Sequence, residues 1–524
     1  MLAIYRYTYV QYTVSTQECQ SKNLILYEIY YKHEIHKSPF CDDEILEHGI
    51  TDNFKIDKGI KQGDTLSPYL FNLFLEDIND IFSSPASKPP ILIKRIIGCL
   101  LYADDLLIVS ETKEGLQNSL NNLYVYCNTW KLELNVKKTS IVIFSQRQHK
   151  HNQEFKFGSQ CIKITDTCKY LGITFHKSGS FNQAVLTLKE KGNKAMFSLS
   201  KSLYTGVTFN PNLPLKVFDS TIRPIITYAC EVWGHQYSKV LLKVNQIDKL
   251  SFESINNRFC KFVMGLPRQA SNFGVKAELG RGLIFSFVCS QVFRYWIRLV
   301  NMDHDRLIKE AYLSELNVTN NGGFSWVNFL IKILETTDLE YLWQRQAQGI
   351  VLHKNNMSSF KMKVQNCITK IYHEHMFKSI NCNSKLRSYV SFKNDYSLEK
   401  YINIYDVPLC WRKLYCSYRI SCHNLEIERG RYVKPSIPPD KRYCRICKNG
   451  AETELHFVLI CKEYCDLRDK LFKTCVLFID NFLNMHDDLK FKYLLNSTHD
   501  IIITSVMEYI YTADKRRKLL LSRC

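Results

Sequence analysis

The clearest helical pattern of apolar residues follows the pair Ser67-Pro68. Ser67 can cap a helix, and Pro68 suits the first helical position because its missing N–H would have no partner there. One face of the predicted helix then carries apolar residues at helical spacing: Leu70, Phe71, Phe74, Leu75 and Ile78. Gly59 and Gly63 precede this helix, and glycine lets a backbone turn sharply or approach a ligand closely.

A strand hairpin is predicted next. Two apolar runs of strand length, residues 96–101 and 106–109, flank the four residues Tyr102-Ala103-Asp104-Asp105. An ordinary hairpin turn favours Asn-Gly or Asp-Gly, and carboxylates in an apolar setting are costly unless they are paired or bind a metal. A local rule broken in this way often marks a functional site.

The pattern returns to a helix after the hairpin. Its apolar stripe, which we interpret as core, consists of Leu116, Leu120, Leu123, Cys127 and Trp130. The segment Leu134-Asn135-Val136-Lys137-Lys138-Thr139 follows, and then an apolar strand over residues 141–144. Beyond it the chain divides into residues 146–214, a mostly helical stretch 215–428, and a C-terminal part 429–524 that begins with a Pro-rich segment.

Composition narrows the class of protein. The chain has 524 residues, is 45% hydrophobic and carries a formal net charge of +19, with a pI of about 9.0. This surplus favours a polyanionic partner, nucleic acid first of all, although a solvated basic surface is the alternative. We find no secretion signal and no run long enough to span a membrane. The 20 cysteines are therefore expected to be reduced in an intracellular protein, nuclear or cytoplasmic and not secreted.

A cluster of cysteines and one histidine lies in the C-terminal part. Cys444, Cys447, His456 and Cys461 have the spacing Cys-x2-Cys-x8-His-x4-Cys, which is typical of a tetrahedral Zn²⁺ site with a structural role. Cys465 is an alternative fourth ligand, and reduced buried thiols with a core histidine are the alternative to a metal. Basic residues interleaved with Tyr432 and Tyr443 surround the cluster: Arg429, Arg431, Lys434, Lys441, Arg442, Arg445 and Lys448.

Four blocks, in this order, resemble the reverse transcriptases of non-LTR (LINE-like) retrotransposons. They are Gly59-Ile60-Lys61-Gln62-Gly63-Asp64-Thr65-Leu66-Ser67-Pro68, Tyr102-Ala103-Asp104-Asp105, Asn135-Val136-Lys137-Lys138-Thr139 and Tyr170-Leu171-Gly172. Arg223-Pro224-Ile225-Ile226-Thr227-Tyr228-Ala229-Cys230 looks like the family's segment after the polymerase core. No chemistry follows from that segment by itself.

The resemblance implies an α+β fold with a partial right-hand polymerase palm. The palm would occupy residues 1–145, and its end with a primer-grip or thumb-like region would occupy 146–214. A mostly helical region of unassigned role would follow at 215–428, and a basic zinc module with C-terminal helices at 429–524. The implied activity is RNA-directed DNA synthesis with an RNA template, a DNA primer or target and deoxynucleoside triphosphates.

The resemblance also implies roles for single residues. Asp104 and Asp105 would hold Mg²⁺ (or Mn²⁺) for two-metal nucleotidyl transfer. The substrate would be contacted by Gln62, Gly63, Tyr102 and Lys138. Tyr170, Leu171 and Gly172 would form the primer grip, for which a plain hairpin turn is the alternative.

One family block has no counterpart. It is an Asp-Phe-x-x-Ala-Phe-Asp-like segment whose first carboxylate bridges both metals, and Met1 to Gln20 contains no acid except Glu18. We therefore expect an N-terminally truncated or degenerate polymerase with impaired activity. The alternative is a non-catalytic nucleic-acid-binding remnant or a domesticated interaction protein.

Overall fold

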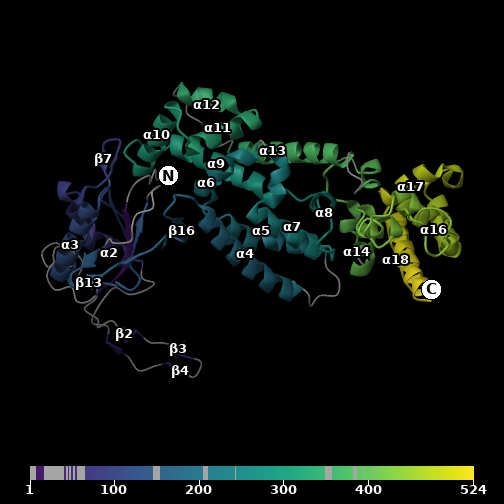
Figure 1. Ribbon diagram of the computed structural model, residues 1–524, viewed down its shortest axis with the longest axis horizontal. Coiled ribbons are helices and arrows are strands. Elements are labelled where there is room, and N and C mark those ends of the chain that lie inside the picture. Colours follow the sequence, from purple (N-terminus) through teal and green to yellow (C-terminus); the bar gives the residue numbers. More distant parts are fainter. Residues whose placement is uncertain are drawn as a thin grey trace. The chain divides into compact units, whose positions relative to one another are not determined.

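The computed structural model describes residues 8–16, 41–42, 45–46, 49–50, 54–55, 65–144, 154–203, 210–241, 243–348, 357–381, 386–393, 395–405 and 407–523 (Figure 1). The chain forms two compact units. The first contains residues 1–184 and 302–327, and the second contains residues 185–301 and 328–524. The four regions predicted from the sequence are a different division and stay a prediction.

Within the described residues of the first unit, six strands form one sheet with the order β14-β11-β1-β9-β8, and β10 also pairs with β1. Their bounds are β1 (Thr8–Thr16), β8 (Cys99–Tyr102), β9 (Asp105–Ser110), β10 (Leu132–Leu134), β11 (Ser140–Ile143) and β14 (Lys163–Ile164). Strand β1 is central. It runs antiparallel to β9 on one side, and to β11 and β10 on the other.

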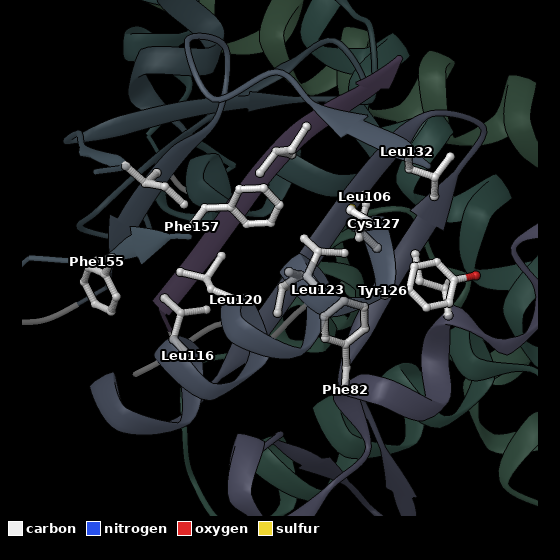
Figure 2. Close-up of a cluster of buried hydrophobic side chains, with 14 of the residues drawn as sticks. Phe82, Leu106, Leu116, Leu120, Leu123, Tyr126, Cys127, Leu132, Phe155 and Phe157 are labelled. Carbon is white, nitrogen blue, oxygen red and sulfur yellow. The ribbon is translucent and has the colours of Figure 1, made fainter. Parts of the chain in front are cut away.

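Helices cover one face of this sheet. They are α2 (Ser67–Phe74), the 3-10 helix η1 (Glu76–Phe82) and α3 (Lys113–Trp130). Thr112 caps α3 by accepting from the backbone N of Gly115. Leu116, Leu120 and Leu123 of the predicted stripe are buried against Leu106 of β9 and Phe82 of η1 (Figure 2). The prediction that this stripe is core is therefore confirmed.

A second hairpin packs on a different set of buried residues. It consists of β15 (Thr167–Tyr170) and β16 (Ile173–His176). Cys168 of β15 is buried with Leu107 and Val109 of β9 and Val142 of β11. Successive strand residues face opposite sides of a sheet, so Leu107 and Val109 lie on the face opposite Leu106 and Ile108.

Two local predictions are wrong in detail. Ser67 is the first residue of α2 rather than its cap, and the cap position is occupied by Leu66, whose apolar side chain offers no hydrogen-bond acceptor for a helix cap. Strand β8 begins at Cys99 rather than at residue 96, because Gly98 passes so close to Phe82 that an added Cβ would lie 2.7 Å from its atoms. Ile96 pairs instead with Ile91, in the small hairpin of β6 (Ile91–Leu92) and β7 (Arg95–Ile96).

The chain returns to the first unit at α10 (Leu307–Asn320). Arg95 of β7 donates from Nε and Nη2 to Oε1 of Glu310, at 3.2 and 3.0 Å, and from Nη2 to the carbonyl of Asp305 at 2.7 Å. These bonds join parts of the sequence that are more than two hundred residues apart. The remaining short strands are β2 (Cys41–Asp42), β3 (Ile45–Leu46), β4 (Gly49–Ile50), β5 (Phe54–Lys55), β12 (Lys156–Phe157) and β13 (Gln160–Cys161).

The second unit is helical, as expected for residues 215–428. Among the described residues its α-helices are α5 (Asn212–Ile226), α6 (Cys230–Trp233), α7 (Ser251–Val263), α8 (Asn272–Glu278), α9 (Ile284–Val300), α12 (Glu340–Ala347), α13 (Met357–Asn381), α14 (Leu409–Arg419), α15 (Glu426–Arg429), α16 (Cys465–Val476), α17 (Asp487–Leu495) and α18 (Asp500–Ser522). Helices α4 (Asn182–Leu203) and α11 (Trp326–Thr336) each cross from one unit to the other. No helix of the described ranges is long and apolar enough to cross a membrane.

Buried ion pairs connect the helices of the second unit. Arg419 of α14 donates to both carboxylate oxygens of Glu278 on α8, at 2.8 and 3.0 Å. Both side chains are almost completely buried, and the Tyr401 hydroxyl donates to the same carboxylate at 2.7 Å. Because the partners satisfy one another, these charges are tolerated away from water.

Candidate functional site

The two adjacent acids lie at the tip of the β8–β9 hairpin. Tyr102 pairs with Asp105, so Ala103 and Asp104 form a two-residue turn. Ala103 has φ of 52°, a left-handed conformation that costs an L-residue roughly 1–2 kcal/mol. Asp104 and Tyr102 are exposed, Asp105 is half-buried and the next residue, Leu106, is fully buried. The carboxylates therefore stand where the buried hairpin reaches solvent.

The β15–β16 hairpin brings Tyr170 close to this turn. Leu171 and Gly172 form its two-residue loop, with φ of 46° and 83°, as a type I′ turn requires. Burial, together with the nearby Asp105 and Cys99, raises the pKa of Tyr170 to about 12. Tyr170 also packs against the buried cluster that contains Leu107 and Val109 of β9, so the predicted primer-grip hairpin lies beside the hairpin that carries the acidic turn.

Lys138 lies in the turn between β10 and β11. Asn135 orders this turn, because its side-chain and backbone oxygens accept from the backbone N of Lys138 at 3.2 and 3.1 Å. On one side of strand β1, Val14 pairs with Leu134 of β10 and Gln11 pairs with Ser140 of β11. On its other side, Thr13 pairs with Asp105 of β9. The exposed Lys138 turn is thus level with Asp105 and about 10 Å away, two inter-strand spacings. Gln62 and Gly63 lie outside the described residues.

The predicted zinc ligands come together. One ligand atom from each of Cys444, Cys447, His456 and Cys461 lies within 4.8 Å of all the others. In a tetrahedral zinc site with ordinary bond lengths, ligand atoms are about 3.5–3.8 Å apart. The donor set and its spacing therefore fit Zn²⁺ after a small contraction. Cys465, the alternative ligand, is exposed and does not belong to this group.

Local backbone geometry presents the four ligands. Lys448 and Gly450 have φ of 57° and 84°, which lets the loop after Cys447 return so that the Cys444 N–H donates to the Gly450 carbonyl at 2.9 Å. The Thr453 hydroxyl accepts from the backbone N of His456 at 3.1 Å and starts the helical segment His456–Ile460. A hydrogen bond from Cys461 lowers the pKa of the Cys444 thiol, which favours the thiolate that a metal binds.

Comparison with known proteins shows what the chain resembles. Residues 15–175 match the family model described as reverse transcriptase (RNA-dependent DNA polymerase). The Pol polyprotein of retrotransposable element R2 from Nasonia vitripennis is 33% identical over 131 residues, which are 23% of this chain and 13% of the relative. The R2DM polyprotein of Drosophila melanogaster is 35% identical over 130 residues, 23% of this chain and 12% of the relative.

A third relative extends the match. The RNA-directed DNA polymerase from mobile element jockey of Drosophila melanogaster is 21% identical over 226 residues, 41% of this chain and 24% of the relative. The chain carries a reverse transcriptase domain of the non-LTR retrotransposon type. The matched parts span only 12–24% of the lengths of these three relatives.

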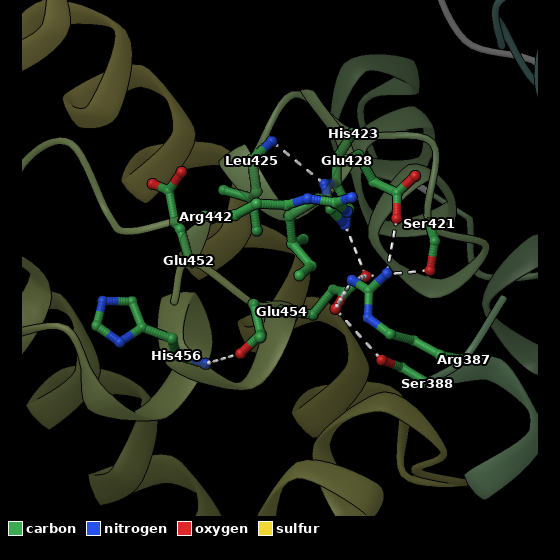
Figure 3. A network of polar contacts seen from close by, with 12 residues as sticks. Arg387, Ser388, Ser421, His423, Leu425, Glu428, Arg442, Glu452, Glu454 and His456 are labelled. Carbon is green, nitrogen blue, oxygen red and sulfur yellow. Dashed lines mark hydrogen bonds and ion pairs between the residues drawn. The ribbon is translucent and has the colours of Figure 1, made fainter. Parts of the chain in front are cut away.

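The reverse transcriptase match covers the acidic turn, the Lys138 turn and the turn after Tyr170, whereas the predicted zinc ligands lie beyond residue 175. Sequence reasoning missed the carboxylates near the Cys/His cluster. Glu454 is buried and accepts from Arg387 Nη2 at 2.7 and 2.6 Å, from Ser421 at 3.0 Å and from Ser388 at 3.3 Å (Figure 3). The signal was available, since Glu452 and Glu454 are acids in an otherwise basic segment.

The basic residues around the predicted zinc ligands do not form one uniform surface. Arg442 is buried and donates from Nε to the Ile437 carbonyl at 2.8 Å, and Arg431 pairs with Glu428 at 3.0 Å. These two cations hold the loop together. The exposed members of the set are Arg429, Lys434, Lys441, Arg445 and Lys448, together with Tyr432 and Tyr443, whose exposed fractions are 66% and 55%.

Proposed function

We propose that this chain is the RNA-directed DNA polymerase of a mobile element, with its palm in the first unit. It would extend a DNA primer along an RNA template with deoxynucleoside triphosphates. The observation that carries the proposal is one juxtaposition. The acidic turn at Asp104, the Tyr170 hairpin and the Lys138 turn are arranged around strand β1. All three turns belong to the residues that match the reverse transcriptase family, although most of β1 precedes them.

Each residue has a role in this proposal. Asp104 and Asp105 offer carboxylate oxygens, the donors that Mg²⁺ or Mn²⁺ prefers. The ions would activate the primer 3′-hydroxyl and stabilise the leaving pyrophosphate. The exposed Lys138 would face the triphosphate, where a fixed cation stabilises developing negative charge. Tyr102 would pack against the nucleotide or the primer end, and the turn Tyr170-Leu171-Gly172 would hold the primer strand.

We further propose that the reaction is impaired in this chain. Two-metal transfer needs a carboxylate that bridges both ions, and the strand beside β9 is the place from which it would reach Asp105. That strand is β1, whose residue paired with Asp105 is Thr13. Its sequence, Thr-Tyr-Val-Gln-Tyr-Thr-Val-Ser-Thr, contains no carboxylate.

Primer extension on an RNA template tests both statements. We expect weak incorporation by the wild type, none by Asp104→Asn, and a gain in Thr13→Asp, which restores a carboxylate at the position paired with Asp105. Asp166→Asn is the matched control. Asp166 is an exposed acid of the same unit whose partner is Lys177, at 2.8 Å, and its loss should leave incorporation unchanged.

Two results would count against the proposal. Equal incorporation by the wild type and Asp104→Asn would remove Asp104 from the metal site. Full activity of the wild type, with no gain in Thr13→Asp, would refute the missing-carboxylate explanation while leaving the polymerase assignment intact.

We also propose that Cys444, Cys447, His456 and Cys461 hold a structural Zn²⁺ in a small basic module within residues 429–524. The ion would fasten the Cys444–Gly450 loop to the segment that ends at Cys461. The exposed Tyr432 and Tyr443 stand among exposed cations, an arrangement that suits base stacking and phosphate contact. Nucleic acid is therefore the expected partner of this module.

A further inference from the structure

Phe287 of α9 holds two cations from two other helices. The guanidinium carbon of Arg223, on α5, is 4.7 Å from the centre of the Phe287 ring, and Nζ of Lys361, on α13, is 5.3 Å from it. Both distances lie within the range of a cation–π contact. Arg294 lies two turns further along α9 and is exposed. We call Arg223, Lys361 and Arg294 the cation cluster.

The cation cluster keeps its positive charge. A cation–π contact fixes a cation in place without supplying the negative charge of a carboxylate. Asp219 is the acid nearest to Arg223, at 3.3 Å, but both of its oxygens already accept from Arg281 at 2.7 Å. Among the residues that the structure describes, no carboxylate lies within ion-pair distance of Lys361 or Arg294.

The members of the cluster repel one another. Burial lowers the pKa of Lys361, and the positive charges of Arg294 and Arg223 lower it further. Burial also lowers the pKa of Arg223, and Asp219 opposes that change only in part. Like charges held together at a partly exposed surface create a positive potential, which an incoming anion would relieve.

We propose that the cation cluster binds the phosphodiester backbone of an RNA strand. The extent of the cluster favours a chain of phosphates over a single one, since Phe287 and Arg294 are seven residues apart on α9, about 10 Å along its axis. The inference rests on the proposed function, because it adds a backbone contact in the helical unit to a protein that copies RNA. It also gives Arg223, which opens a family-like segment without assigned chemistry, a part in binding.

The test is the salt dependence of RNA binding by the full chain. Fluorescence anisotropy with a labelled single-stranded RNA would be recorded over a series of KCl concentrations for the wild type and for Lys361→Gln/Arg294→Gln. Each lost phosphate contact should make the slope of log K against log salt less negative by about 0.7. For two contacts the change is about 1.4, and the same relation predicts roughly 14-fold weaker binding at about 0.15 M salt.

The matched control is Lys370→Gln/Lys378→Gln. Both lysines are exposed on the same helix, α13, so this variant removes the same charge outside the cluster and should change the slope by less than half as much. An equal change in the control would overturn the proposal, because it would reveal only general attraction to a basic surface. If the double variant unfolds, Arg294→Gln alone should still change the slope by about 0.7.

The remaining outcomes separate the inference from the proposed function. If the wild type does not bind RNA, the proposed function fails as well. If the wild type binds RNA and the double variant binds equally, only the cluster assignment fails. A last experiment adds inorganic phosphate at matched ionic strength. If phosphate displaces RNA from the wild type but not from the double variant, the cluster binds a free oxyanion, and the assignment to RNA is overturned.

Discussion

Arg517 of α18 and Glu452, which lies two residues after the Cys444–Gly450 loop, form a buried ion pair whose loss should loosen the C-terminal helix. Arg517 donates from Nε to Oε1 at 2.8 Å and from Nη2 to Oε2 at 2.7 Å. The exposed fractions of the two side chains are only 4% and 1%. Arg517→Met keeps an apolar side chain of similar length but removes both donors. Glu452 would then keep the backbone N–H of Glu426, at 2.8 Å, as a donor.

The size of the effect follows from this geometry. A hydrogen bond to a charged group contributes about 1.5–3 kcal/mol, and two such bonds are lost. Removing one partner of a buried ion pair costs about 3–5 kcal/mol, because the other charge stays buried and unpaired. We therefore expect the free energy of opening α18 to fall by about 4 kcal/mol. Since each 1.36 kcal/mol changes the opening equilibrium constant tenfold, the backbone amides of α18 should exchange with solvent roughly 900-fold faster.

Hydrogen exchange of the peptides that cover Asp500–Ser522, recorded by mass spectrometry, measures this change. The matched control is Lys518→Met on the same helix. Lys518 is 64% exposed and pairs with Asp514 at 2.7 Å, a surface contact whose loss should cost at most about 0.5 kcal/mol, roughly a twofold change in exchange. Similar exchange in both variants would refute the reasoning. Adding Glu452→Gln to Arg517→Met should recover part of the protection, since it removes the unpaired charge.

Three further outcomes are expected. Leu123→Ala should lower the free energy of unfolding of the first unit by about 3–4 kcal/mol in urea denaturation, because Leu123 is only 1% exposed. Val125→Ala, at a 63% exposed position of the same helix, should change that free energy little. Cys461→Ser should abolish the binding of one zinc ion measured by metal analysis, and Cys465→Ser should not. Burial raises the pKa of Asp248, but Lys276 and hydrogen bonds lower it by more. The stability that Asp248 contributes is therefore complete above its unfolded pKa of about 3.9 and is lost as the pH falls through its lower folded pKa. In Asp248→Asn, the free energy of unfolding should consequently fall less steeply as the pH is lowered into the acid range.

Features with a short repeat in the sequence could be predicted well. The stripe of α3 repeats every three or four residues, and Leu116, Leu120, Leu123 and Cys127 of the predicted set are buried. Trp130 is only partly buried, and Tyr126 is buried although it was not predicted. The hairpin over Tyr102 to Asp105 was also correct, apart from the start of β8. That start depends on the packing of Gly98 against Phe82, a tertiary contact that no local pattern contains. Strand β1 was missed, although its alternation of Thr, Val and Tyr is typical of a strand.

The parts of the candidate sites that are close together in the sequence could be predicted, and those formed by distant residues could not. The four predicted zinc ligands lie within a span of eighteen residues, so their spacing could indicate the cluster. Their supporting carboxylates could not be found by spacing, because Glu452 meets Arg517 across 65 positions and Glu454 meets Arg387 across 67. The juxtaposition of Asp105 with Tyr170 follows from the packing of two hairpins on one sheet. The cation cluster also depends on tertiary structure, since α5, α9 and α13 each supply one of its cations.

The return of the chain to the first unit at α10 has a consequence for how this protein is made and divided. Residues 185–301 are synthesised after the sheet strands and before the segment 302–327 that completes the first unit. On the ribosome, the smaller segment of the second unit, residues 185–301, therefore emerges before Glu310 is available to pair with Arg95, although domains generally fold in order of synthesis. For the same reason no single cut releases the first unit whole. A fragment that ends at residue 184 would leave the Arg95 guanidinium without its carboxylate and the β6–β7 hairpin without α10. A fragment that contains the whole first unit would have to include both segments, 1–184 and 302–327.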